Sequence, residues 1–96
     1  MYSSIRRYKI EPKNIDELTR KVREEFVPII NKLPGFIDYY LMDTGEGVIA
    51  SINIFENEVG AEESNKRAAI WSKKYPDLFP SSAEIIAGPI LLSKAG

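Results

Sequence analysis

The chain has 96 residues, of which 28% are charged, and its formal net charge is −1. A chain of this size builds one core and buries roughly 60–70% of the surface that its unfolded form exposes, so a second subunit would add useful stability. The near balance of charge gives no long-range attraction to nucleic acid or to an anionic membrane.

Two residue types are absent, and each absence narrows the chemistry. Without cysteine there is no disulfide, no thiolate nucleophile and no zinc–thiolate site. Without histidine, the usual general base near neutral pH and the commonest metal ligand are missing. The sequence also has no phosphate-cradling glycine loop between a strand and a helix. We therefore expect that the protein needs no metal, haem or flavin.

The sequence shows no targeting or membrane-spanning pattern. Its first residues lack the apolar stretch of a signal peptide. No apolar run approaches the ~20 residues that span a bilayer. We expect a cytoplasmic protein in which residues 1–96 form a single domain.

The first third of the chain predicts a strand followed by a long helix. Residues 2–10 are rich in β-forming side chains. Asn14, with Glu17 three residues later, resembles a capping box at a helix start. Apolar residues then recur at helical spacing up to residue 33. A proline inside this helix lacks the amide donor, which predicts a kink within residues 24–28.

The rest of the chain predicts three more strands and a second helix. The expected elements are a strand over 36–43, a hairpin turn over 44–47, a strand over 48–55, a helix over about 58–74, a turn over 75–80 and a strand over 83–92. Glycines in the hairpin supply the positive φ angles that tight turns need. Asn57 is the expected N-cap of the second helix.

The order strand–helix–strand–strand–helix–strand is the pattern of the ferredoxin-like α+β fold. This fold predicts a four-stranded antiparallel sheet with two helices on one face. Pro89 fits that topology, because the last strand lies at a sheet edge, where a proline is tolerated.

The third strand predicts a homodimer. A sheet with one wet face should alternate apolar and polar residues. Here one face carries four apolar residues, and Ile49 and Phe55 make the other face largely apolar as well; the four are Val48, Ala50, Ile52 and Ile54. Two helices can cover only one face, so we expect a second copy on the other. The alternative, shielding by the chain's own tail, is weaker because little sequence follows Leu92.

The inward face of the second helix has two interpretations. Its residues are mostly small or polar: Gly60, Ala61, Ser64, Asn65, Ala68 and Ser72. Small side chains either let the helix approach the sheet closely or leave a cavity with Trp71 and Tyr75 as walls. Ligand pockets combine apolar walls with a few convergent polar groups.

The strands supply the polar groups for such a cavity: Ser4, Arg6, Tyr8, Tyr40, Ser51 and Asn53. Asn53 is either a hydrogen-bonded sheet residue, a residue of the dimer seam, or a donor that stabilises an oxyanion or enolate. Arg6 either binds a carboxylate or phenolate of a ligand, or pairs with a carboxylate across the dimer. The tyrosines are most simply amphipathic strand residues.

Four stretches of the chain resemble a known family. Residues 6–10, 26–28, 33–36 and 61–71 are similar to the antibiotic-biosynthesis-monooxygenase-like domains, and the resemblance extends over nearly the whole chain. Those domains are dimeric α/β-barrel proteins of the ferredoxin-like fold. The resemblance implies a cofactor-independent monooxygenase that oxidises aromatic or quinol-type substrates with O₂. A haem-degrading branch uses a strand asparagine, a helix tryptophan and a helix histidine. This chain has Trp71 but no histidine and no asparagine on its first strand, which argues against haem degradation.

Two functional hypotheses remain. In the first, the protein is an oxygenase in which Arg6 and Asn53 are catalytic and stabilise a substrate anion; the substrate-binding residues are then Tyr8, Tyr40, Ser51, Asn65, Trp71 and Tyr75. In the second, the protein is a non-catalytic homodimer that binds a small molecule or another partner. A cavity of at least ~300 Å³ between the sheet and the second helix is the observation that favours a ligand site.

Overall fold

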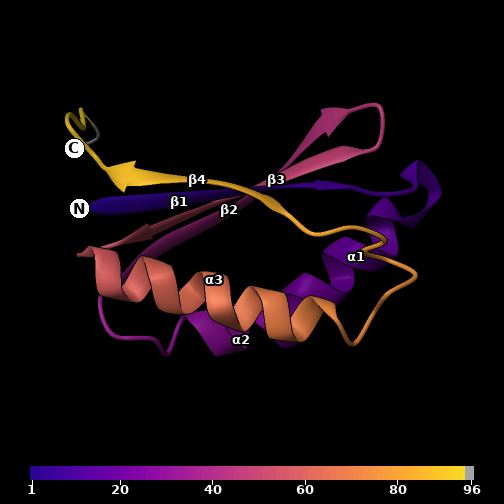
Figure 1. Ribbon diagram of the computed structural model, residues 1–96, viewed down its shortest axis with the longest axis horizontal. Coiled ribbons are helices and arrows are strands. Elements are labelled where there is room, and N and C mark those ends of the chain that lie inside the picture. The colour runs from indigo at the N-terminus through magenta and orange to yellow at the C-terminus, as the bar shows by residue number, and fades with distance from the viewer. Residues whose placement is uncertain (95–96) are drawn as a thin grey trace.

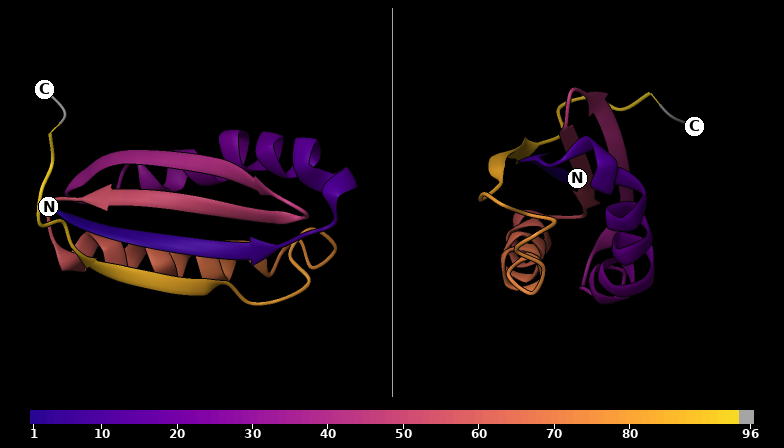
Figure 2. Two further views of the ribbon diagram at one scale, coloured as in Figure 1. Left: turned by 90° about the horizontal axis from the view of Figure 1, so that it is seen from above. Right: turned by 90° about the vertical axis from the view of Figure 1, so that its right-hand side faces the viewer.

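The computed structural model describes residues 1–94 and has the predicted order of elements. Those elements are β1 (Tyr2–Lys9), η1 (Pro12–Asn14), α1 (Ile15–Lys21), η2 (Val22–Phe26), α2 (Val27–Ile30), β2 (Phe36–Gly45), β3 (Val48–Phe55), α3 (Glu58–Ser72) and β4 (Glu84–Pro89). All strand pairs are antiparallel, in the order β2-β3-β1-β4. The segments α1, η2 and α2 follow one another without a break and form the first helix, and α3 is the second. Both helices lie on one face of the sheet (Figures 1 and 2). The ferredoxin-like α+β prediction is therefore confirmed, and Pro89 lies on an edge strand as expected.

The core lies between the sheet and the two helices. The first helix contributes residues spaced four apart, all of them buried: Leu18, Val22, Phe26 and Ile30. From β3, Ile49 and Phe55 point toward the helices and are buried as well. The helical spacing in the sequence thus marked the buried stripe correctly.

A π-helical turn overlaps the segment in which the kink was predicted. Residues Val22–Phe26 form η2, between the α-helical segments on either side. Pro28 follows directly in α2 and has no amide hydrogen to donate to the carbonyl four residues earlier. A wider turn just before it is one way for the helix to absorb that loss.

The capping box predicted at Asn14 does not form. Asn14 ends the short 3₁₀ turn η1, with φ −96° and ψ 1°, and its side chain makes no capping hydrogen bond. An N-cap needs an extended backbone to bring its side chain onto the first free amides of the helix. Asn57 has that geometry, and its Oδ1 accepts a hydrogen bond from the Gly60 amide at 3.4 Å.

At the start of α3, a small residue is needed because the helix lies very close to its neighbours. A Cβ added to Gly60 would lie 2.5 Å from Phe55 Cδ1 and 2.8 Å from the Pro34 carbonyl oxygen. A side chain larger than hydrogen therefore does not fit there.

The last strand is shorter than predicted, because its pairing with β1 ends at Pro89, apart from one hydrogen bond from the Ile90 amide to the Met1 carbonyl at 2.9 Å.

The face of the sheet turned away from the helices is largely apolar and uncovered. Tyr40, Ile52, Ile5 and Ile86 stand side by side across the four strands. Tyr40 is 52% exposed and Ile86 is 73% exposed. The two-sided apolar pattern predicted from the sequence is present.

Within residues 1–94, no helix has both the length and the apolar character that crossing a bilayer requires.

Candidate active site

A cluster of fully buried polar side chains lies under the centre of the sheet. Antiparallel pairing sets Ser4 opposite Asn53, and Arg6 opposite Ser51, all on the helix-facing side. Ser64 reaches the same place from α3. Buried polar groups are almost always hydrogen-bonded, and these form one connected network.

Arg6 is the centre of that network, and the residue is 1% exposed. Nη1 donates to Ser64 Oγ at 3.2 Å and to Asn65 Oδ1 at 2.9 Å. Nη2 donates to Asn53 Oδ1 at 2.8 Å. Within residues 1–94, Nε has no acceptor, and Cζ lies 5.5 Å from the centre of the Phe26 ring.

The charge of Arg6 is therefore not neutralised by its neighbours. All three acceptors are uncharged, and no carboxylate bonds to Arg6 in the described part of the chain. Burying an unpaired charge costs several kcal/mol, so such a residue is rare unless something pairs with it. The arrangement can receive an anion. Arg6 faces the helices and not the open face of the sheet, on which a second copy was expected.

Asn53 holds Arg6 in place and has no donor to spare. Its Nδ2 donates to the Ser4 carbonyl at 3.0 Å and to Ser51 Oγ at 3.2 Å. Both amide hydrogens have acceptors, so its geometry fits the interpretation of a hydrogen-bonded sheet residue. It supports the guanidinium and lines neither of the cavities described next.

A cavity of about 450 Å³ lies beside α3, above the ~300 Å³ expected of a ligand site. Arg6 and Tyr8 line it from the sheet. Its other lining residues are Asn65, Ala69, Ser72, Lys73, Pro76, Phe79, Pro80, Ser81, Ser82, Ala83 and Ile85. Burial raises the pKa of Tyr8, against the opposing effect of the Arg6 charge, so its phenol is a neutral hydrogen-bond donor at pH 7.

A second cavity, of about 20 Å³, lies between the two helices and the middle of the sheet. It is lined by Arg6, Tyr8, Leu18, Val22, Phe26, Tyr39, Leu41, Ile49, Ser51, Ala68, Trp71 and Phe79. Arg6, Tyr8 and Phe79 line both cavities, so the two cavities adjoin at these residues. Burial raises the pKa of Tyr39 to about 12, so it too stays protonated near neutral pH.

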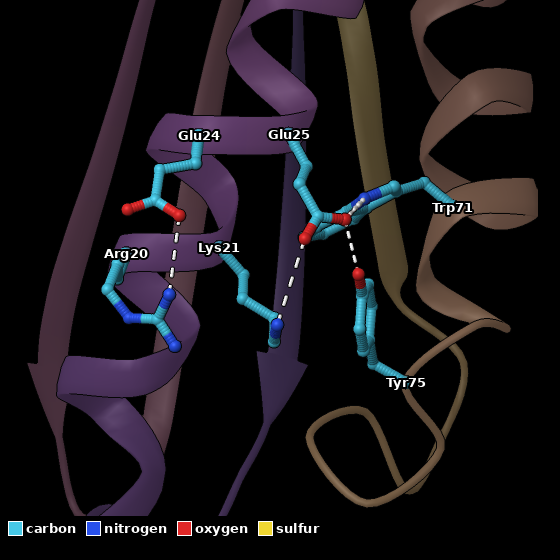
Figure 3. A network of polar contacts seen from close by, with 6 residues as sticks. All are labelled: Arg20, Lys21, Glu24, Glu25, Trp71 and Tyr75. Atoms are coloured by element: carbon cyan, nitrogen blue, oxygen red, sulfur yellow. Dashed lines mark hydrogen bonds and ion pairs between the residues drawn. The ribbon is translucent and has the colours of Figure 1, made fainter.

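Trp71 and Tyr75 are held by a carboxylate that no motif in the sequence marks. Trp71 Nε1 donates to Glu25 Oε1 at 3.2 Å, and the Tyr75 hydroxyl donates to the same oxygen (Figure 3). Lys21 Nζ lies 3.7 Å from Glu25 Oε2 and 4.7 Å from the centre of the Tyr75 ring. The hydrogen bond from Tyr75 is the main reason that the pKa of Glu25 is lowered. In the sequence, Lys21 and Glu25 look like an ordinary surface pair at i and i+4.

Tyr40 does not belong to this site. It points to the open face, where its hydroxyl donates to Asp38 Oδ2 at 2.7 Å. An irregularity in the pairing of β2 lies between Phe36 and Asp38 and reverses which residues face the helices. Tyr39 therefore faces inward in place of Tyr40. Of the other predicted site residues, Arg6 and Tyr8 line both cavities, Asn65 lines only the large one, and Ser51 and Trp71 line only the small one. Tyr75, predicted as a pocket wall, lines neither cavity.

The fold is shared with several solved structures. The chain superposes on a protein of unknown function from Nitrosomonas europaea with a TM-score of 0.79 and 18% identity, over 99% of this chain and 93% of that one. A variant of MhuD with two manganese protoporphyrin IX molecules per active site gives a TM-score of 0.76 and 16% identity, over all of both chains. The monooxygenase ActVA-Orf6 of Streptomyces coelicolor, in complex with nanaomycin D, gives 0.72 and 16%, over 96% of this chain and 92% of that one.

The predicted resemblance is confirmed at the level of the fold. Other proteins with this fold, from Nitrosomonas europaea and Bordetella bronchiseptica, are provisionally named antibiotic biosynthesis monooxygenases. The sequence itself matches no protein-family model and no curated protein. In the part of the chain that the structure describes, no group of acidic side chains is arranged to hold a metal ion.

Proposed function

We propose that this protein is a cofactor-independent monooxygenase that acts with O₂ on a small aromatic or quinol-type substrate in the large cavity. The observation that carries the proposal is the buried, unneutralised Arg6 in the wall of a 450 Å³ cavity. An oxidisable phenol reacts with O₂ far more readily as its anion, and a fixed positive charge beside the phenol favours that anion. The bound ligands of MhuD and ActVA-Orf6 support flat aromatic compounds as candidates.

In this mechanism the protein supplies orientation and electrostatics. Arg6 pairs with the phenolate or enolate of the substrate and lowers the pKa of that group. Tyr8, protonated at neutral pH, donates a second hydrogen bond. Asn53, Ser64 and Asn65 hold the guanidinium rigid, so little reorganisation is needed during the reaction. One oxygen atom enters the substrate, and the other leaves as water with two hydrogens from the substrate.

Oxygen uptake tests this proposal. Purified protein is mixed with a panel of hydroquinones, naphthols and dihydroxyanthracenes, and O₂ consumption is compared with the uncatalysed rate. We expect at least one compound to be oxidised faster with the protein, and label from ¹⁸O₂ to enter the product. Arg6→Met should lose this acceleration, whereas Arg20→Met, at an exposed position on the first helix, should keep it. No acceleration across the panel would contradict the proposal.

A second candidate is a non-catalytic binder of aromatic anions. The observation in its favour is that, in residues 1–94, neither a carboxylate nor an imidazole lines the large cavity to act as a general base. Binding is followed through Trp71, the only tryptophan, whose ring centre lies 5.6 Å from that of Phe79 in the cavity wall. A compound that changes this fluorescence but consumes no O₂ would favour the binder.

We further propose that a second copy of the chain covers the open face of the sheet. The row of Tyr40, Ile52, Ile5 and Ile86 is apolar, and Met42 beside it is also exposed. Apolar patches of this kind mark interfaces. Ile52→Asp should give a folded monomer of about half the mass by sedimentation equilibrium. Ile49→Asp, on the buried face, should unfold the chain instead. A monomeric wild-type protein at micromolar concentration would refute the dimer.

A further inference from the structure

The large cavity is lined by two cationic side chains and, within residues 1–94, by no acidic one. Arg6 is buried at the sheet, whereas Lys73 is exposed and caps the C-terminal end of α3. We propose that the ligand of this cavity is an aromatic acid: its phenol or enol pairs with Arg6, and its carboxylate pairs with Lys73. This inference rests on the function proposed above and adds a second anionic group to the substrate.

The charge of Lys73 is available to a ligand. In the described part of the chain, the ion pairs use other cations, namely Arg7, Arg20, Lys21 and Arg67. A lysine at the C-terminal end of a helix also interacts favourably with the helix dipole. Lys74 is at the same end of α3, is equally exposed and does not line the cavity. The two lysines therefore share the role at the helix end and differ in their access to the cavity.

The two cations lie at separate places along α3. Asn65, Ala69, Ser72 and Lys73 all line the cavity, and their spacing of four, three and one residues puts them on one side of the helix. Asn65 Oδ1 accepts a hydrogen bond from Arg6 Nη1 at 2.9 Å and so marks the Arg6 end. Lys73 comes eight residues later, which is about 12 Å along the helix axis. A two-ring aromatic acid with its phenol and its carboxylate at opposite ends suits this arrangement.

The rest of the lining suits an aromatic ring that carries oxygen substituents. The apolar lining residues are Ala69, Pro76, Phe79, Pro80, Ala83 and Ile85. Hydroxyl groups come from Tyr8, Ser72, Ser81 and Ser82. The segment that follows α3 turns back toward β4 (Figure 1) and supplies most of these residues. A cavity with apolar walls and a few polar groups is typical of a site for a small organic molecule.

A carboxylate fits the Lys73 end better than a phosphate does. Phosphate sites typically use helix N-termini, whose free amides point at the anion. Here the cavity meets the opposite end of α3, where the carbonyls carry partial negative charge. The Trp71 carbonyl, for example, accepts only a backbone hydrogen bond from Lys74, at 3.1 Å. A single lysine beside this end balances one negative charge, which is the charge of a carboxylate.

The expected gain in affinity is modest, because Lys73 is exposed. A solvent-exposed ion pair corresponds to roughly a two- to fivefold change in Kd. Salt screens such a pair, so the gain should shrink as the ionic strength rises. Arg6 is buried, and its contribution should depend much less on salt.

Isothermal titration calorimetry of acid and ester pairs tests the proposal. Three hydroxynaphthoic acids that differ in the spacing of their two groups are each compared with their methyl ester, which lacks the negative charge. We expect the acid with its groups at opposite ends of the rings to bind the wild-type protein roughly two- to fivefold more tightly than its ester at low salt. The preference should be lost at high salt, a result that needs no variant.

The adjacent lysines provide matched variants. Lys73→Met should weaken binding of the acid to the level of its ester and leave binding of the ester unchanged. Lys74→Met should keep the preference for the acid. Both positions are exposed, and thermal melting checks that both variants fold. A preference that survives in Lys73→Met, or that disappears equally in Lys74→Met, would refute the role of Lys73.

The outcomes separate this inference from the oxygenase proposal. If the acid binds with the expected dependence on Lys73 but no phenol or quinol is oxidised, the oxygenase fails and the site for an aromatic acid stands. If an uncharged quinol is oxidised faster with the protein, and the acids bind no better than their esters, the oxygenase stands and the second anionic group is refuted. If none of the acids or esters binds, the inference is likewise refuted.

Discussion

Arg6→Met should remove ligand binding without destabilising the fold. Methionine keeps an unbranched apolar side chain in the space of the arginine stem and removes the guanidinium. The change deletes the three hydrogen bonds to Asn53, Ser64 and Asn65. For an ordinary buried residue, such a loss would be strongly destabilising.

The expected change in stability follows from the hydrogen bonds that each former partner of Arg6 retains in the variant. Asn65 Oδ1 still accepts from Ser4 Oγ at 2.7 Å, and Ser64 Oγ still donates to the Ala61 carbonyl at 2.8 Å. Only Asn53 Oδ1 loses its donor, which costs about 1–3 kcal/mol. Against this, the variant removes a buried charge that has no carboxylate partner, and such a charge costs several kcal/mol. The stability should therefore be unchanged, or up to about 2 kcal/mol higher, in Arg6→Met.

Urea unfolding followed by Trp71 fluorescence measures the stability, and titration with a dihydroxynaphthalene measures binding. In a domain of this size, 1 kcal/mol corresponds to about 4–8 °C in Tm. Arg20→Met is the control, since Arg20 forms an exposed pair with Glu24 that contributes about 0.5 kcal/mol or less. A loss of more than about 3 kcal/mol in Arg6→Met would mean that the network is a structural element and would refute the reasoning.

Three further predictions concern other parts of the molecule. The pKa of Glu25 is lowered in the folded protein, so the stability that Glu25 contributes is present above its unfolded pKa of 4.5 and is lost as the pH falls through its folded pKa. Trp71 fluorescence should therefore change in acid, because Trp71 donates a hydrogen bond to Glu25. Glu25→Gln should abolish this change. Gly60→Ala should cost about 1–3 kcal/mol in urea unfolding because of overpacking, whereas Gly88→Ala, which meets no atom within 4 Å, should cost far less. In a spectrophotometric titration one phenol, Tyr39, should ionise only at a pH of about 12; full ionisation of all tyrosines by pH 10.5 would contradict its burial.

The fold was predictable because its signals are local and periodic. The stripe from Leu18 to Ile30 and the two-sided apolar pattern of β3 each depend on the spacing of residues alone, which folding does not change. The capping box failed for a local reason as well. A 3₁₀ turn, which the sequence does not mark, changes the backbone at Asn14 and turns its side chain away from the helix.

The candidate site was only partly predictable, because it depends on which residues face inward. Arg6 and Tyr8 were identified as polar residues on one face of a strand, but the sequence does not state whether that face meets the helices. The single irregularity in β2 moved Tyr40 out and Tyr39 in. Glu25 contacts residues more than 45 positions away, and no pattern within its own helix reports such a contact.

The π-helical turn sets the register of the whole first helix against the sheet. In a regular α-helix, residues spaced four apart drift by about 40° at each step, so four of them in succession spiral away from a flat surface. The wider turn from Val22 to Phe26 takes up part of that rotation, which keeps Leu18 and Ile30 on the same buried line. In a regular α-helix over the same residues, Ile30 would lie about 120° around the axis from Leu18. The wider turn therefore lets one continuous helical segment present the same face to the sheet along its whole length.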